Sequence, residues 1–206
     1  MSPPLSFSRR RALSTAAALF IAACSQPAPL KSTFILKPAR PAASGAPARA
    51  ATLRVDAVTV AAPFRDRSLV YRESELKYET DFYNEFLIAP SPMLAEAIAG
   101  WLSAAGLYRA VLPPSSTLDA DLSLDAFVTE LYGDLRDAGK PAAVVAIKFF
   151  LLATGGAPGS FLWTGELQAR RDVPSPSAEA IVGGLDAALG EVLEQLAAAL
   201  RALPVK

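Results

Sequence analysis

Alternating hydrophobic and polar positions, the pattern of a half-buried β-strand, recur along this chain. In one such stretch Leu53, Val55, Ala57 and Thr59 share one side. Residues 142–152 are apolar almost throughout, which predicts a central strand covered on both faces. The predicted strands cover residues 33–37, 52–60, 68–72, 75–80, 122–128, 142–152 and 161–170.

Two later segments carry apolar residues at helical spacing. The first has Ser91 as its expected N-cap and Pro92 at the first helical position, and Gly106 suits its end. The second follows Ser177, which we expect to cap it, and its apolar stripe reaches Leu203. Close approach to a sheet would explain three glycines within that helix, namely Gly183, Gly184 and Gly190.

Together these elements predict an α+β fold of two layers, with a mainly antiparallel sheet and two helices packed on one face. The strands at 68–72 and 75–80 are expected to form a hairpin with a turn near Glu73 and Ser74. The last three strands are expected to be consecutive and antiparallel. Residues 38–51, rich in proline and alanine, are predicted to be a mobile loop.

The N-terminal segment has a different pattern. Residues 1–23 contain three charges, all basic, followed by twelve uncharged residues from Ala12 to Ala23. This layout is typical of a secretory signal peptide. Twelve helical residues span about 18 Å, well short of a hydrocarbon core of about 30 Å, so a transmembrane helix is the poorer interpretation. We expect residues 1–23 to be removed, and the sequence leaves open the general or the twin-arginine export route.

The end of this segment, Ile21-Ala22-Ala23-Cys24, resembles the bacterial lipobox, and Cys24 is the only cysteine of the chain. We therefore expect cleavage between Ala23 and Cys24 and lipidation of Cys24, with an accidental thiol as the alternative. Residues 24–32 would form a lipidated tether and residues 33–203 the folded domain. Two or more acyl chains hold a protein stably in a membrane. Ser25, in place of aspartate, favours the periplasmic face of the outer membrane over the inner membrane.

The amino-acid composition limits the kinds of catalysis and binding that the protein can carry out. The chain has no histidine, which removes the commonest general base and the commonest metal ligand. Its 20 basic and 20 acidic residues give no field of one sign that would attract nucleic acid. A hydrophobic content of 52% supplies ample material for a core. We expect no enzyme, no cofactor, no metal and no nucleic-acid partner.

Motif by motif, the sequence supports this expectation. The glycine-rich run at 155–159 lacks the lysine of a phosphate-binding loop and is predicted to be a hairpin turn. A cation site could be imagined at Asp119, Asp121 and Asp125, but their spacing fits the lead-in and solvent face of a strand. An enzyme that uses carboxylates alone is the least favoured alternative.

The segment from residue 71 to residue 86 is rich in aromatic and charged side chains and is the least core-like part of the chain. Partner surfaces are enriched in tyrosine, phenylalanine and arginine. The alternative is that these residues only cover the end of a helix. The candidate partner surface consists of Tyr71, Tyr78, Phe82, Tyr83 and Phe86.

Several motifs in order suggest a family. They are the lipobox, Phe34-Ile35-Leu36-Lys37, the strand at 53–60, the run from Phe64 to Arg72, and the helix entry Ala89-Pro90-Ser91-Pro92-Met93-Leu94. From Cys24 to about Leu203 the chain resembles the ABC-type transport auxiliary lipoproteins, the Pqi-type group that accompanies Mce-domain transporters.

The resemblance implies a non-enzymatic component of an ABC system that moves lipids or other hydrophobic molecules across the cell envelope. Its implied partners are an Mce-domain substrate-binding protein and, through it, the ABC permease and ATPase. A homo-oligomer around an Mce-type tube stays open. A lipoprotein activator of a cell-wall synthase is the alternative, because it would share the anchor, the size and the lack of catalytic residues.

Overall fold

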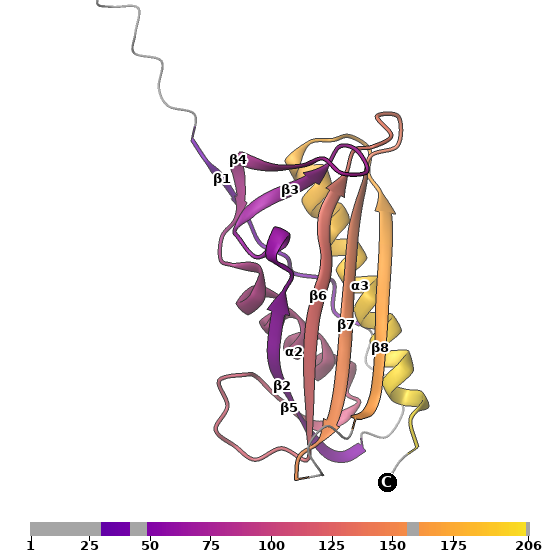
Figure 1. Cartoon of the computed structure of the whole chain (residues 1–206). Helices are drawn as coiled ribbons and strands as arrows, with labels where there is room; N and C mark the ends of the chain where they lie inside the picture. The colour runs from indigo at the N-terminus through magenta and orange to yellow at the C-terminus, as the bar shows by residue number, and fades with distance from the viewer. Residues whose placement is uncertain (1–29, 42–48, 156–160, 205–206) are drawn as a thin grey trace, which may run out of the picture. The chain divides into compact units, whose positions relative to one another are not determined.

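The computed structural model describes residues 30–41, 49–155 and 161–204 (Figure 1). Residues Lys31–Lys206 form one compact unit. Its elements are, in chain order, β1 (Ser32–Phe34), β2 (Arg49–Val60), the 3-10 turn η1 (Ala62–Phe64), β3 (Ser68–Arg72), β4 (Tyr78–Phe86), α2 (Pro90–Ala105), β5 (Tyr108–Leu112), β6 (Leu122–Asp134), β7 (Ala142–Ala153), β8 (Phe161–Asp172) and α3 (Ala178–Ala202).

The eight strands of the described residues form one mixed sheet. Six follow the order β1-β4-β3-β6-β2-β5, and β7 and β8 continue the sheet from β6. β2 lies parallel to both of its neighbours, and the pairs β3–β6 and β1–β4 are also parallel. The prediction of a mainly antiparallel sheet is therefore wrong. Alternating polarity reports which face of a strand is buried, whereas direction depends on the connections, and β2 reaches β5 and β6 only through long crossovers.

Other parts of the predicted architecture are confirmed. Strands β6, β7 and β8 are consecutive and antiparallel. β7 pairs on both edges and is buried over most of its length, as its continuous apolar sequence predicts. Both helices cover the same face of the sheet, α2 over β2 and β5 and α3 over β7 and β8 (Figure 1).

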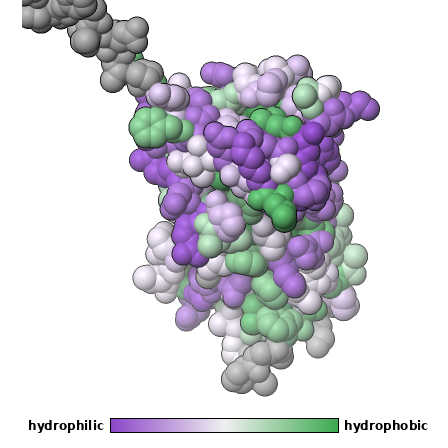
Figure 2. Space-filling model, turned by 45° about the horizontal axis from the view of Figure 1, so that its top comes forward, coloured by the Kyte–Doolittle hydropathy of each residue, from purple (hydrophilic) through white to green (hydrophobic). Residues whose placement is uncertain are grey.

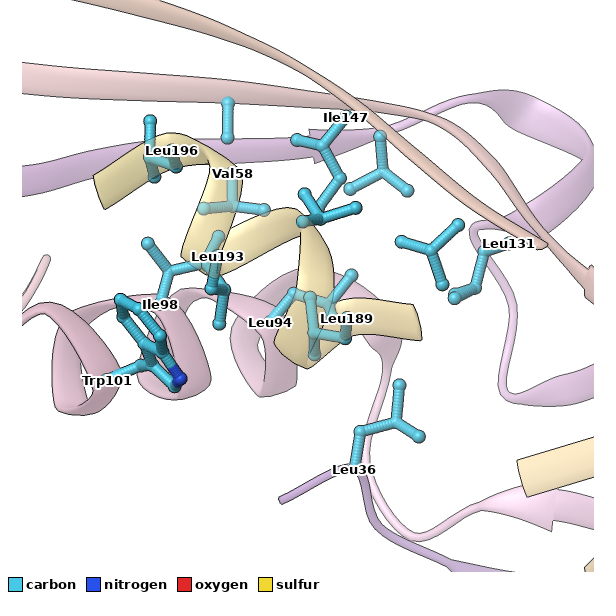
Figure 3. Close-up of a cluster of buried hydrophobic side chains, with 14 of the residues drawn as sticks. Leu36, Val58, Leu94, Ile98, Trp101, Leu131, Ile147, Leu189, Leu193 and Leu196 are labelled. Carbon is cyan, nitrogen blue, oxygen red and sulfur yellow. The ribbon is translucent and has the colours of Figure 1, made fainter. Parts of the chain in front are cut away.

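The hydrophobic core lies between the helices and this face of the sheet (Figure 3). Burial of each large aliphatic side chain contributes about 1.5–3 kcal/mol relative to exposure. All of the buried hydrophobic residues described lie between Leu36 and Leu200. Residues from both helices and from three strands meet in one cluster that includes Val58, Leu94, Ile98, Leu131, Ile147, Leu189, Leu193 and Leu196.

The alternation of buried and exposed positions along β2 shifts by one residue halfway along the strand. Leu53 and Val55 are buried as predicted, but beyond them the buried positions are Val58 and Val60. The register between β2 and β6 shifts between Val55 and Val58. Because an extra residue at such a bulge turns the following side chains to opposite faces, Thr59 is exposed, contrary to the prediction.

The hairpin is present, but its second strand begins later than predicted. β4 starts at Tyr78 rather than at residue 75 and continues to Phe86. The backbone N–H groups of Glu73 and Ser74 both donate to the carbonyl of Lys77, which closes a longer turn. β5 was not predicted from the sequence.

Helix α2 begins two residues earlier than predicted. Its N-cap is Ala89 and Pro90 is its first residue. The Ser91 hydroxyl donates instead to the carbonyl of Val58, which ties the helix to β2. Gly106 ends the helix in the left-handed conformation, with φ 65°, as the sequence predicts.

In α3, Ser177 is the N-cap as predicted, and its hydroxyl accepts a backbone N–H. The explanation of the glycines by close approach holds only at Gly184. A Cβ there would meet Val173 and would lie 2.8 Å from the Cβ of Ala143 on β7. A Cβ on Gly183 would have no neighbour within 4 Å, and a Cβ on the third glycine would make only an ordinary contact.

Residues 35–41 do not form the predicted strand end and mobile loop. After β1 the chain packs against the helices, with Leu36 buried. The indole N–H of Trp101 on α2 donates to the carbonyl of Ala39 at 3.1 Å, and the Lys37 N–H donates to Asp186 of α3. The remainder of the predicted loop lies outside the described residues up to β2.

Candidate partner surface

Two of the five predicted surface residues form an exposed aromatic pair on β4. The side chains of Phe82 and Tyr83 are 72% and 47% exposed. Their ring centroids are 5.1 Å apart in an edge-to-face arrangement. The ammonium group of Lys31 lies 5.1 Å from the centroid of Phe82, a cation–π distance. Figure 2 shows patches of hydrophobic surface set among hydrophilic residues at this end of the molecule.

Tyr78 is also exposed, at 42%, but belongs to a different cluster. Its ring lies 6.2 Å from that of Phe64 and 5.7 Å from that of Tyr132, both edge to face. The guanidinium of Arg72 lies 5.5 Å from the Tyr78 ring. Tyr78 is therefore partly exposed, while its ring contacts pack the start of β4 against η1 and β6.

The remaining two predicted residues do not form a surface. Phe86 is only 2% exposed and packs in the core. Tyr71 is half-buried. A Cβ on Gly133 would lie 2.9 Å from its ring, so the lack of a side chain at Gly133 leaves room for the ring against β6. Burial, and then the hydrogen bond to Asp81, raise the pKa of Tyr71. The candidate partner surface thus contracts to Tyr78, Phe82 and Tyr83.

Asp81 fixes the backbone that carries this aromatic pair. Its carboxylate accepts hydrogen bonds from the Tyr71 hydroxyl at 3.0 Å, the Asn84 amide at 2.8 Å and the Tyr83 N–H at 2.8 Å. Burial alone would raise the pKa of Asp81, but these hydrogen bonds outweigh it, so the pKa lies below its ordinary value. Because the strand is already ordered, Phe82 and Tyr83 would lose little conformational freedom on binding.

The hairpin also carries exposed charge. The side chains of Glu75 and Glu79 are 76% and 58% exposed. Lys77 pairs with Glu73 and lies 3.8 Å from Glu79. An acidic hairpin beside exposed aromatic rings is suited to a partner that offers both apolar and basic groups.

An ion cluster that the sequence analysis missed joins this hairpin to the sheet. Asp134, at the end of β6, is 2% exposed and accepts from Arg136 at 2.8 and 2.9 Å and from Arg170 on β8. Arg136 reaches on to Glu75 of the hairpin at 2.6 Å. The hydrogen bond from Arg136, and then that from Arg170, hold the pKa of Asp134 well below its usual range against the effect of burial.

Sequence spacing gave no signal for this cluster. Asp134 and Arg170 are 36 positions apart. They meet because β7 lies between their strands: Asp134 is opposite Ala142 of β7, and Arg170 is opposite Val144, two residues further along. A lone aspartate at the end of an alternating strand looks like a solvent-facing residue.

The imagined cation site at Asp119, Asp121 and Asp125 is not formed. The described part of the chain holds no group of three or more cysteine, aspartate or glutamate side chains placed to bind a metal. The Asp121 carboxylate instead accepts from the backbone N–H and the hydroxyl of Thr52 at 2.7 and 2.8 Å. These hydrogen bonds lower the pKa of Asp121 and link the starts of β6 and β2.

The lipidation site at Cys24, its cleavage site and the glycine-rich turn at 156–159 lie outside the described residues. The described chain begins at Leu30, two residues before β1. Among the helices that the structure describes, none has the length and apolarity to cross a membrane.

Comparison with solved structures shows that the fold recurs. A protein from Xanthomonas campestris is 17% identical, with a TM-score of 0.68 over 80% of this chain and 92% of that chain. An uncharacterized protein is 19% identical, with a TM-score of 0.64 over 85% of this chain and 99% of that chain. PelC from Paraburkholderia phytofirmans, solved as a dodecamer, is 20% identical, with a TM-score of only 0.42 over 77% of this chain and 93% of that chain. At such low identities the likeness concerns the fold alone.

No curated protein matches the sequence. The family model of the ABC-type transport auxiliary lipoprotein component, however, matches residues 34–197, from the first strand to the last turns of α3. Such a component is non-catalytic and works in association with an ABC transport system. Because the match spans most of the chain and nearly the whole core of the fold, this protein belongs to the ABC-type transport auxiliary lipoprotein family.

Proposed function

We propose that this lipoprotein serves an Mce-type ABC system that transports lipids or other hydrophobic molecules across the cell envelope, and that it docks the transporter at the outer membrane. The family match over residues 34–197 carries the proposal. The resemblance to the Pqi-type group supplies the transporter class, and Ser25 after the lipobox cysteine supports the outer membrane.

In this proposal the signal peptide is removed between Ala23 and Cys24, and the acyl chains on Cys24 hold the domain at the periplasmic face of the membrane. From Cys24 to Thr33 an extended chain reaches at most about 32 Å. The folded domain therefore stays close to its own membrane. A tethered domain meets a membrane-bound partner at an effective concentration far above its bulk value, so a weak contact is enough for docking.

We assign the contact with the Mce-domain protein to the exposed residues of the hairpin, Tyr78, Phe82 and Tyr83. Their support is geometric: two rings are exposed on a strand that Asp81 holds in place. Exposed aromatic residues on an ordered backbone are the usual energetic centres of protein interfaces.

The test is co-purification of the solubilised lipoprotein from its native host, with the double variant Phe82→Ser and Tyr83→Ser beside the wild type. We expect the wild type to capture an Mce-domain protein and the variant to lose most of it. Leu118→Ser is the matched control, because Leu118 is 65% exposed but lies in the loop before β6, away from the hairpin.

Unfolding temperatures of both variants should match the wild type, since neither site is in the core. Capture of a cell-wall synthase with no transporter protein would contradict the proposal and favour the alternative role. Capture of the Mce protein by the double variant at the wild-type level would leave the transport role intact but refute the assigned surface.

A further inference from the structure

A cavity of about 490 Å³ opens at the end of the sheet opposite the hairpin. It lies where β2, β5 and β6 begin, where β7 ends and where α3 gives way to the C-terminal residues. Its walls are mainly apolar and include Ala51, Tyr108, Leu122, Leu151, Leu162 and Leu203. No element of the sequence pattern indicates it, because these residues come from six different segments of the chain.

Arg49 explains why a charged residue can line an apolar cavity. Its guanidinium donates to the carbonyls of Leu200 and Leu203 at 2.8 and 2.7 Å, and so satisfies the open end of α3. Burial raises the pKa of Tyr108, and the nearby charge of Arg49 only partly opposes this, so the phenol stays neutral. The cavity is therefore mainly apolar, and its charged lining residues are Arg49, whose donors the end of α3 uses, together with Arg109 and Asp121.

A second arginine, Arg109, lies at the mouth of the cavity and makes weaker interactions than Arg49 does. The Arg109 side chain is 66% exposed, and its ion pair with Asp121 is long, at 3.9 Å. The same oxygen of Asp121 already accepts two short hydrogen bonds from Thr52. With respect to the described residues, most of the five N–H donors of Arg109 remain available to an anionic group.

We propose that this cavity binds the alkyl chain of a single-chain amphiphile, with the anionic headgroup, a carboxylate or a phosphate, held at Arg109. The cavity volume lies toward the lower end of the range of about 300–1,000 Å³ for small-molecule sites, which favours one chain over two. Leu122, Leu151 and Leu162 contact the chain. The site does not depend on the transport role and would give the lipoprotein a ligand of its own.

The test uses residues 25–206, because all of the described core lies within them. Isothermal titration calorimetry with dodecanoate, dodecyl phosphate and dodecyltrimethylammonium, each below its micelle concentration, should show saturable binding of the two anions and much weaker binding of the cation. Inorganic phosphate alone should not bind. The loss of charged hydrogen bonds predicts that Arg109→Gln weakens dodecanoate roughly five- to tenfold. Arg65→Gln should not change dodecanoate binding, because this exposed arginine lies beyond the end of β2 that is opposite the cavity.

Ala51→Trp, which fills the cavity, should abolish binding of both anions. Because that variant could disturb folding, Leu162→Glu provides a second block at a half-exposed wall residue, with exposed Leu76→Glu as its control. Equal binding of anion and cation, or binding that survives both blocking variants, would overturn the proposal. Binding only at the micelle concentration would also overturn it, as would a second copy of the chain occupying the cavity, detected as a dimer by sedimentation.

Discussion

The Asp134 carboxylate is the single charged side chain that the described residues bury almost completely. An isolated buried charge is costly, and a pair repays that cost only when its hydrogen bonds are well made. Here Arg136, in the turn after β6, and Arg170, on β8, both meet the carboxylate, and both remain partly exposed to water. This cluster of three residues thus joins the end of β6 to β8. Most of the desolvation cost falls on the aspartate, because both arginines stay partly exposed.

Asp134→Asn should lower the free energy of unfolding at pH 7 by about 1–3 kcal/mol, because two arginines lose their anionic acceptor. The folded pKa of Asp134 is depressed, so its contribution is present above the unfolded pKa of about 3.9 and is lost as the pH falls further. The difference between variant and wild type should therefore shrink below pH 4. Urea unfolding at pH 7, 5 and 3 measures this, and a difference unchanged at pH 3 would contradict it.

Exposed Asp66→Asn is the matched control for that series and should change stability by less than about 0.5 kcal/mol at pH 7.

Two adjacent glycines of α3 should respond to alanine in opposite directions. Gly184→Ala forces a Cβ against Val173 and Ala143 and should destabilise the fold by about 1–3 kcal/mol. Gly183→Ala has open space and should stabilise it by up to about 1 kcal/mol, because alanine loses less backbone entropy in a helix. Thermal unfolding of the two variants provides the measurement. Equal effects would mean that the close packing of α3 on β7 is wrong.

At the scale of elements, the local chemistry of helix ends was the most predictable feature. Gly106 and Ser177 act as the sequence indicates, because each works within one turn of its own helix. Ser91 does not, since its hydroxyl finds the carbonyl of Val58 on β2. The helix begins before Ser91, at Pro90, so the Ser91 hydroxyl does not stand at the cap position.

The C-terminal end of α3 depends on a residue more than 150 positions away. Arg49 donates to the carbonyls of Leu200 and Leu203, and also lies 3.3 Å from that of Arg201. Arg49→Met keeps the apolar stem but removes the donors, and should cost about 1–2 kcal/mol. Amide hydrogen exchange in the last turn of α3 should accelerate more than in its first turn. Uniform acceleration along the helix would show that the effect is global, and Arg65→Met should produce neither change.

At the scale of the whole molecule, anchoring and folding are expected to be separable. The described core starts at Leu36, twelve positions after Cys24. Cys24→Ser should therefore release the protein from the membrane fraction, while the unfolding temperature of the folded domain stays within about 1 °C of the wild type. Fractionation of host cells and mass spectrometry of the N-terminal peptide measure the first effect. An unmodified Cys24 in wild-type protein would refute lipidation.

The aromatic surface shows where prediction from sequence reached its limit. The segment was correctly placed on a hairpin, but Phe86 turned out to be core and Tyr71 half-buried. Composition identifies a segment as rich in aromatic residues, but it does not tell which rings face the core and which face solvent. That choice depends on the bounds of β4, which differ from the predicted ones by several residues.

By itself the sequence determined the position of most strands, both helices and most of their ends. These features depend on burial period and on hydrogen bonds within a few residues. Tertiary structure alone decided the parallel pairings of β2, the bulge that exposes Thr59, the cluster at Asp134 and the cavity beside Tyr108. Each of these brings together groups from distant parts of the chain, and a pattern of local spacing carries no record of which distant partner lies closest in space.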